Sequence, residues 1–215
     1  MVRNGLRGRK QLYECKDCGR QFLGGKRRDK AQVITDYMDG IAWLKKHGFK
    51  IYGVVIDGMK GLAKSLYPYP VQLCQFHQML TVRKYITQDP DIEASRTLLD
   101  LVNDITKMDK ESFIGAFEEW HEKYQDVLNE RVHDKRIKKK TPPFMRPRLR
   151  SAYFSVRRNM PLLWTFYDRP ELGLPNTNNA LEGLFSDLKT KVRVHSGISR
   201  DHRRKLLDEY IKRNY

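Results

Sequence analysis

Residues 51–77 constrain the fold more than any other stretch, because a helix-length segment separates two short apolar runs there. The first run, Ile-Tyr-Gly-Val-Val-Ile, ends in Asp57 and Gly58, and the second ends in Cys74-x-x-His77. Strand-like runs that alternate with helical segments are typical of βαβ units. Open α/β sheets bind their ligands at the carboxyl ends of the strands, so we expect Asp57 to lie at a functional edge.

The charge balance indicates a polyanionic partner. The chain of 215 residues carries 42 Lys and Arg against 26 Asp and Glu, a net charge of +16. A positive excess of this size favours nucleic acid as the partner. No apolar run approaches the roughly 20 residues that span a bilayer, so we expect no membrane association. Three cysteines do not make a disulfide framework, and we expect a cytoplasmic location.

The basic N-terminal arm, residues 1–30, contains half of a zinc ribbon. The segment Tyr-Glu-Cys-Lys-Asp-Cys-Gly-Arg-Gln-Phe places an aromatic residue on each side of Cys15 and Cys18. A structural zinc ion takes four ligands, and no second Cys-x-x-Cys follows within about 20 residues. Either the ribbon is cut at Met1, or the two thiols carry no metal. We favour a truncated ribbon that binds zinc poorly.

Periodicity predicts the main elements. We expect helices at 31–46, 60–66 and 75–86, with strands at 49–56 and 71–74 between them. Residues 89–168 are predicted to be all-helical apart from a basic loop at 131–150. In that segment Asp109 caps a helix whose core face is formed by aromatic and aliphatic residues at a spacing of three to four. These residues are Phe113, Phe117, Trp120, Tyr124 and Leu128.

Two basic segments are predicted to contact DNA phosphates. The first is the proline-broken loop at 131–150, and the second follows a late helix that Thr177 or Asn178 can cap. The candidate DNA-binding residues are Lys138, Lys139, Lys140, Arg146, Arg148, Arg193, Arg200, Arg203 and Arg204.

The late helix also carries Glu182, one turn past its start. We expect the stripe of Leu181, Leu184, Phe185 and Leu188 to be buried and the carboxylate of Glu182 to point into a cleft. Asp57 and Glu182 are hard oxygen ligands that suit Mg²⁺ or Mn²⁺. Two such ions about 4 Å apart catalyse in-line phosphoryl transfer.

Three blocks resemble the DDE transposases of bacterial insertion sequences, close to their Mutator-like group. Ile56-Asp57-Gly58-Met-Lys-Gly-Leu resembles the second-aspartate block, and Cys74-Gln-Phe-His77 resembles the Cys-x-x-His signature. Residues 176–199, with Asn-Ala-Leu-Glu-Gly and the basic segment after it, resemble the glutamate helix. The half-ribbon is also typical of transposases with an N-terminal zinc module.

The resemblance implies an RNase H-like (retroviral-integrase-like) α/β core with a large all-α insertion. Its first part would lie at 31–88, the insertion at 89–168, and the glutamate helix with a basic C-terminal segment at 169–215. It implies a nucleoid-associated enzyme of mobile elements that cleaves insertion-sequence ends and transfers the strands to target DNA, with a homodimer as the usual working form. Asp57 and Glu182 would be the second and third catalytic carboxylates and would hold Mg²⁺ or Mn²⁺.

The first aspartate of that family has no counterpart on an apolar strand before residue 31, so we expect the core to be incomplete at its N-terminal strands. The alternative to an active transposase is therefore a non-catalytic DNA-binding remnant. A basic RNA-associated zinc-ribbon protein is a weaker third reading. Cys74 and His77 are open to three roles, as ligands of a partial zinc site, as structural residues or, for His77, as a DNA contact.

Overall fold

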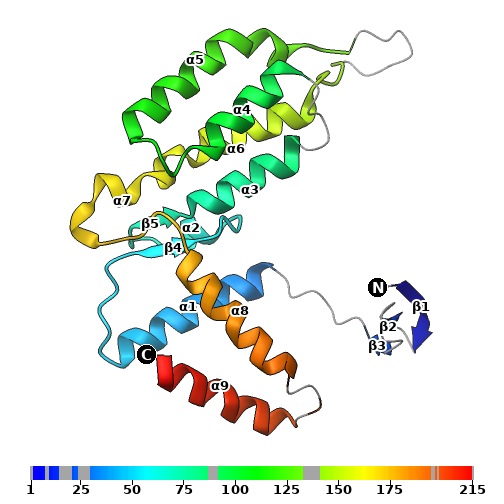
Figure 1. Ribbon diagram of the computed structural model, residues 1–215, viewed down its shortest axis with the longest axis vertical. Helices are drawn as coiled ribbons and strands as arrows, with labels where there is room; N and C mark the ends of the chain where they lie inside the picture. The colour runs from blue at the N-terminus through cyan, green and yellow to red at the C-terminus, as the bar shows by residue number, and fades with distance from the viewer. Residues whose placement is uncertain are drawn as a thin grey trace. The chain divides into compact units, whose positions relative to one another are not determined.

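The protein divides into two compact units, residues 1–50 and residues 51–215. The computed structural model describes residues 2–7, 10–14, 21–23, 30–86, 92–132, 141–194, 197 and 199–214 (Figure 1). Each unit is described by itself below. Among the described residues, no helix is long and apolar enough to cross a membrane.

The first unit combines a small antiparallel sheet with one helix. Strands β1 (Val2–Arg7), β2 (Lys10–Glu14) and β3 (Gln21–Leu23) pair in the order β1-β2-β3. Helix α1 (Lys30–Lys46) confirms the helix predicted at 31–46. It is followed two residues later by Gly48, whose φ of 86° is in the left-handed region that glycine tolerates best. Cys15 and Cys18, in the segment between β2 and β3, lie outside the described residues.

The prediction of an RNase H-like core is wrong. In the described part of the second unit the sheet has two short strands, β4 (Val54–Ile56) and β5 (Val71–Leu73), paired in parallel, and the rest is mostly helical. The predicted strands at 49–56 and 71–74 pair over only three residues each, since α3 begins directly after Cys74. Strands β1 to β3 pair only with one another in the described part, so they do not extend this sheet.

A βαβ connection does join the two parallel strands. Helix α2 (Leu62–Ser65) lies between them in sequence, and the chain turns into it at Gly58 and Gly61, where φ is 94° and 95°. Both values require the left-handed conformation, which glycine adopts without a steric penalty. The sequence therefore predicted the connection correctly but overestimated how much sheet it would support.

Four long helices form the bulk of the second unit (Figure 1). They are α3 (Gln75–Ile86), α4 (Glu93–Asn103), α5 (Lys110–Asn129) and α6 (Pro147–Leu163). Helix α3 packs against both α4 and α6, α5 packs against α4 and α6, and α6 also contacts β5. Helix α6 begins at Pro147 and not after the basic segment, so the last four residues of the predicted loop at 131–150 are helical. Proline at the first helical position needs no N–H partner, which explains the early start.

The core of this bundle is aromatic, as predicted. All five residues of the α5 stripe are buried, and Phe117 and Trp120 stack on Tyr153 of α6 with ring centroids 5.1 and 5.6 Å apart. Asp109 caps α5 by accepting a 2.8 Å hydrogen bond from the backbone N–H of Ser112. The helical periodicity of this segment therefore predicted both the start of the helix and its buried face.

The last elements are α7 (Thr165–Asp168), the 3-10 helix η1 (Pro170–Leu172), α8 (Asn179–Val194) and α9 (Arg200–Asn214). Helices α8 and α9 pack against each other. The predicted burial of the α8 apolar stripe is wrong, because no residue of α8 is buried and Leu181 and Phe185 are 45% and 46% exposed. The segment at 200–214, read from sequence only as a basic tail, is a helix.

Candidate functional site

Asp57 lies at the carboxyl end of β4, as the sequence predicted. Ile56 pairs with Leu73, and the carbonyl of Ile56 accepts a 2.8 Å hydrogen bond from the N–H of Cys74. The two strand ends are therefore adjacent, with Asp57 following one and Cys74 following the other. The Asp57 side chain is exposed, and its Oδ1 accepts a 3.1 Å hydrogen bond from the N–H of Met59. One carboxylate oxygen thus stabilises the turn that leads into α2.

Cys74 connects this edge to the start of α8. Its side chain is fully buried, and its Sγ–H donates a 2.9 Å hydrogen bond to Oδ1 of Asn178. Asn178 directly precedes α8. Its side chain therefore connects the start of this helix to the end of β5. The sequence left the role of Cys74 open, and the contacts support a structural one.

Gln75 and Asn176 form a second link one residue further along. The N–H of Gln75 donates to the carbonyl of Asn176 at 3.0 Å, and Nδ2 of Asn176 donates to Oε1 of Gln75 at 3.1 Å. Reciprocal bonding of this kind fixes both the position and the direction of the segment before α8. Leu174 adds an apolar contact, because a Cβ placed on Gly53 would lie 2.9 Å from its Cδ1.

His77 and Glu182 make the third link. Nδ1 of His77 lies 3.4 Å from Oε1 of Glu182, with the two side chains 28% and 43% exposed. Although the side chains are partly exposed, these two facing atoms are buried, and neither has a hydrogen-bond partner. The pair is an ion pair only when His77 is protonated. Glu182 therefore points toward the first turn of α3 and meets a histidine there. That its carboxylate points into a cleft stays a prediction.

A group of buried glutamines holds α3 in place below these links. Gln72 and Gln75 both donate to the carbonyl of Leu163 at the end of α6, at 3.0 and 3.2 Å. Gln78 donates to Ser155 at 3.0 Å and accepts from Asn159 at 2.7 Å. Buried amides with satisfied donors and acceptors rigidify a core. Sequence reasoning missed this group, although three glutamines at a spacing of three around the Cys-x-x-His block were a usable signal.

The structure brings the three sequence blocks together. The first turn of α8 follows the Cys-x-x-His block by about 100 residues, and the bonds above join the two at the carboxyl end of β4 and β5, where Asp57 also lies. Among the described residues, however, no three His, Cys, Asp or Glu side chains gather closely enough to hold a metal ion. The zinc candidates Cys15 and Cys18 lie outside the described part of the chain.

The predicted DNA-binding residues fall into three groups. Lys138, Lys139 and Lys140 lie outside the described residues. The side chains of Arg148, Arg193, Arg203 and Arg204 are exposed, and Arg200 begins α9. Arg146 is only half-exposed and its Nε is buried. Lys189, the first residue of the basic tail predicted to hold DNA, is exposed on α8 between Glu182 and Arg193.

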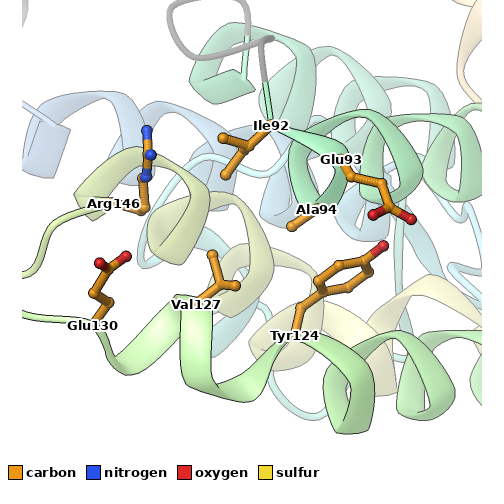
Figure 2. Close-up of a pocket in the computed structure, with 7 residues that line it drawn as sticks. All are labelled: Ile92, Glu93, Ala94, Tyr124, Val127, Glu130 and Arg146. Atoms are coloured by element: carbon orange, nitrogen blue, oxygen red, sulfur yellow. The ribbon is translucent and has the colours of Figure 1, made fainter.

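Arg146 instead lines a pocket of about 270 Å³ in the helical bundle (Figure 2). The guanidinium group of Arg146 lies on the same side as Glu130, while Tyr124 points its hydroxyl toward Glu93 on the other side (Figure 2). A 2.9 Å hydrogen bond from Nζ of Lys123 lowers the pKa of the Glu93 carboxyl. The pocket is remote in the fold from the links around Cys74, since α4, α5 and the start of α6 supply its lining.

Two arginines of the basic loop are used internally. The guanidinium groups of Arg131 and Arg150 each lie 3.8 Å from the ring centroid of Phe144, and Arg131 pairs with Phe144 in an isolated β-bridge. Arg150 also donates to Asn129 at 3.0 Å. This cation–π cluster ties together the two ends of the segment at 132–143. Neither arginine is thus freely available to phosphates.

Helices α8 and α9 are locked by Tyr210. Its hydroxyl donates a 2.7 Å hydrogen bond to Asp187, and Nζ of Lys191 lies 4.6 Å from the centre of its ring. This hydrogen bond, and next a hydrogen bond from Lys191, lower the pKa of the Asp187 carboxyl. The lock fixes the position of the basic last turn of α8 relative to α9.

Comparison with protein-family models, with curated proteins and with solved structures found no match to this chain.

Proposed function

We propose that this protein is a DNA transposase in lineage and acts on double-stranded DNA at the place where its three sequence blocks meet. The observation that carries the proposal is their convergence. Blocks that resemble the second-aspartate, Cys-x-x-His and glutamate segments of transposases are far apart in sequence, yet direct hydrogen bonds join Cys74 to Asn178 and Gln75 to Asn176. A resemblance confined to local sequence would not require these contacts.

The charge on α8 supports DNA as the substrate. Lys189 and Arg193 follow Glu182 by 7 and 11 positions, so they lie within about 20° of it around a helix of 3.6 residues per turn. A rise of 1.5 Å per residue places them about 10 and about 16 Å along the axis from Glu182. These separations correspond to about three to five base pairs of B-DNA. The two cations therefore lie on the Glu182 side of α8, and we expect them to contact a phosphate backbone there.

The described residues supply only two of the ligands for the metal that the resemblance implies. Asp57 and Glu182 are the residues that would hold Mg²⁺ or Mn²⁺, and a bound ion would stabilise charge on a phosphoryl group. In the described part of the chain they are not joined by a third donor. One oxygen of Asp57 already accepts from Met59, and one of Glu182 faces His77. We therefore derive no cleavage step from these residues.

A second candidate function is a DNA-binding transposase remnant without catalysis. The contact of Glu182 with His77 favours it, because in the described part of the chain no third donor joins Glu182 and Asp57 in the carboxylate site that transposase catalysis requires. The basic face of α8 and the exposed Arg203 and Arg204 of α9 do not depend on that pairing. In this reading the protein holds DNA and competes with an active enzyme for it.

One experiment distinguishes the two candidates. The full chain is incubated with a supercoiled plasmid in Mg²⁺ and in Mn²⁺ to detect strand cleavage, and its affinity for a labelled duplex is measured by fluorescence anisotropy. The variants are Asp57→Asn and Glu182→Gln, with Asp126→Asn and Glu119→Gln on exposed parts of α5 as matched controls. Cleavage that is lost only in the first two variants supports a transposase, whereas equal binding by all five proteins without cleavage supports the remnant. Binding that does not depend on salt contradicts both.

A further inference from the structure

The contact between His77 and Glu182 is unusual in its chemistry. Nδ1 of His77 and Oε1 of Glu182 face each other at 3.4 Å, and both atoms are buried without a hydrogen-bond partner. A buried polar atom with no partner destabilises the folded state. Here two such atoms converge on the same space. Their chemistry, a ring nitrogen and a carboxylate oxygen, is that of two ligands for a cation.

We propose that His77 and Glu182 form a divalent-cation site of their own, in which His77 and not Asp57 is the partner of Glu182. The separation fits this role. Two ligand atoms about 2.1 Å from one ion are about 3.0 Å apart at a right angle and about 3.4 Å apart at a tetrahedral angle. The observed separation of 3.4 Å therefore matches two ligands of one ion at a tetrahedral angle.

The position of Asp57 supports the same assignment. Its Oδ1 accepts a hydrogen bond from the N–H of Met59, so one of its two oxygens stabilises its own turn. Among the described residues, Asp57 does not join His77 and Glu182 in a group of three donors. The remaining coordination positions would be filled by water and by phosphate oxygens of DNA, as is common for ions that act on nucleic acids.

The ligand pair predicts which ion binds. Mg²⁺ strongly prefers oxygen ligands, whereas imidazole nitrogen suits transition metals such as Zn²⁺ and is accepted by Mn²⁺. We therefore expect Mn²⁺ and Zn²⁺ to bind this pair more tightly than Mg²⁺. The cation site rests on the proposed function in one respect: a phosphate of bound DNA completes the coordination. Metal and DNA should then each raise the affinity for the other by the same factor.

The test is a Mn²⁺ titration of the full chain, followed by electron paramagnetic resonance with and without a 20-base-pair duplex. Cys15→Ser and Cys18→Ser are introduced throughout, so that the N-terminal thiols contribute no binding. We expect His77→Ala and Glu182→Gln each to weaken Mn²⁺ binding at least tenfold and Asp57→Asn to leave it within twofold. Thermal unfolding without metal checks that each variant is folded.

A second measurement uses the protein with His77 and Glu182 unchanged, so it does not depend on whether the variants fold. Electron spin-echo envelope modulation of bound Mn²⁺ should show a nitrogen nucleus of the imidazole ring. Absence of the nitrogen signal, absence of Mn²⁺ binding, or loss of binding in Asp57→Asn but not in His77→Ala would each overturn the site. Anisotropy of the labelled duplex without metal tests DNA binding separately. If DNA binding fails while the nitrogen signal persists, the proposed function is overturned and the cation site is not.

Discussion

Cys74 donates a 2.9 Å hydrogen bond to Oδ1 of Asn178, a residue 104 positions later in the chain. The thiol is fully buried at the end of β5, and Asn178 directly precedes α8. The bond therefore fixes the start of the helix that carries Glu182 against the strand edge that carries Asp57. A small polar contact in this position determines whether the two carboxylate-bearing elements are neighbours.

Removal of this contact should loosen α8 without unfolding the bundle. Asn178→Ala leaves the buried thiol without its acceptor, at a cost of about 1 kcal/mol. We expect amide hydrogen exchange to become faster in the first turns of α8 and to stay unchanged in α5. An Asn159→Ala control breaks a hydrogen bond of Gln78 instead and should affect α3 and α6. Faster exchange throughout α3 to α6 in Asn178→Ala would contradict the local role assigned to this bond.

Gly53 should be intolerant of a side chain. A Cβ at this position would lie 2.9 Å from Cδ1 of Leu174 and 3.2 Å from the backbone carbonyl oxygen of Pro70. The leucine can move but the carbonyl cannot move without disturbing β5, so we expect Gly53→Ala to destabilise the unit by about 1–3 kcal/mol. Urea unfolding measures this loss.

Gly115 provides the matched control for that measurement. It lies within α5, and a Cβ placed on it meets no atom within 4 Å. Gly115→Ala should therefore stabilise the protein by roughly 0.4–1 kcal/mol through the lower entropy of the unfolded chain. The account of the close approach at Gly53 fails if the two alanine variants change the unfolding free energy in the same direction.

The aromatic ring of Phe144 should hold the basic segment in place. Phe144→Ala removes two guanidinium contacts at 3.8 Å, each worth roughly 0.5–1 kcal/mol at an exposed site. We expect trypsin to cleave between Arg131 and Arg150 several times faster in this variant. Phe144→Tyr keeps an aromatic face and should behave as the native protein. Equal cleavage rates in all three proteins would show that the cluster does not restrain the segment.

The α8–α9 lock should weaken in acid. Because the Tyr210 hydroxyl and then Lys191 lower the pKa of Asp187 in the folded state, the stabilisation is present above the unfolded pKa. It is lost as the pH falls through the lower folded pKa, which places the change below about pH 4. In Tyr210→Phe the Asp187 pKa should rise toward its ordinary value in a carboxyl NMR titration. Tyr52→Phe, at an exposed position, is the control, and an equal shift in both variants would contradict the assignment.

The sequence predicted local structure well and long-range structure poorly. The Asp109 cap and the buried α5 stripe follow from side chains within a few residues of each other, and both are confirmed. The size of the sheet depends on which strands meet, and the short runs around Val54 and Val71 contain no information on a third partner. The α8 stripe shows the same limit, since an amphipathic pattern predicts an apolar face but not what covers it.

In the candidate site, some features could be predicted from the sequence and others could not. The position of Asp57 at a strand end could be inferred from residue order. Contact between His77 and Glu182 could not, because these residues are 105 positions apart and come from different helices. The stacking of Arg131 and Arg150 on Phe144 could not be inferred either, since a basic segment gives no sign of which of its charges lie on an aromatic ring.

The most direct test of the central claim, that DNA lies along the Glu182 face of α8, is the salt dependence of duplex binding. Lys189→Gln combined with Arg193→Gln should lower the slope of log K against log salt by about 2, because two phosphate contacts are lost. Lys84→Gln, an exposed cation on α3, should leave the slope unchanged. An unchanged slope in the double variant, with binding otherwise intact, would contradict the placement of DNA on this face.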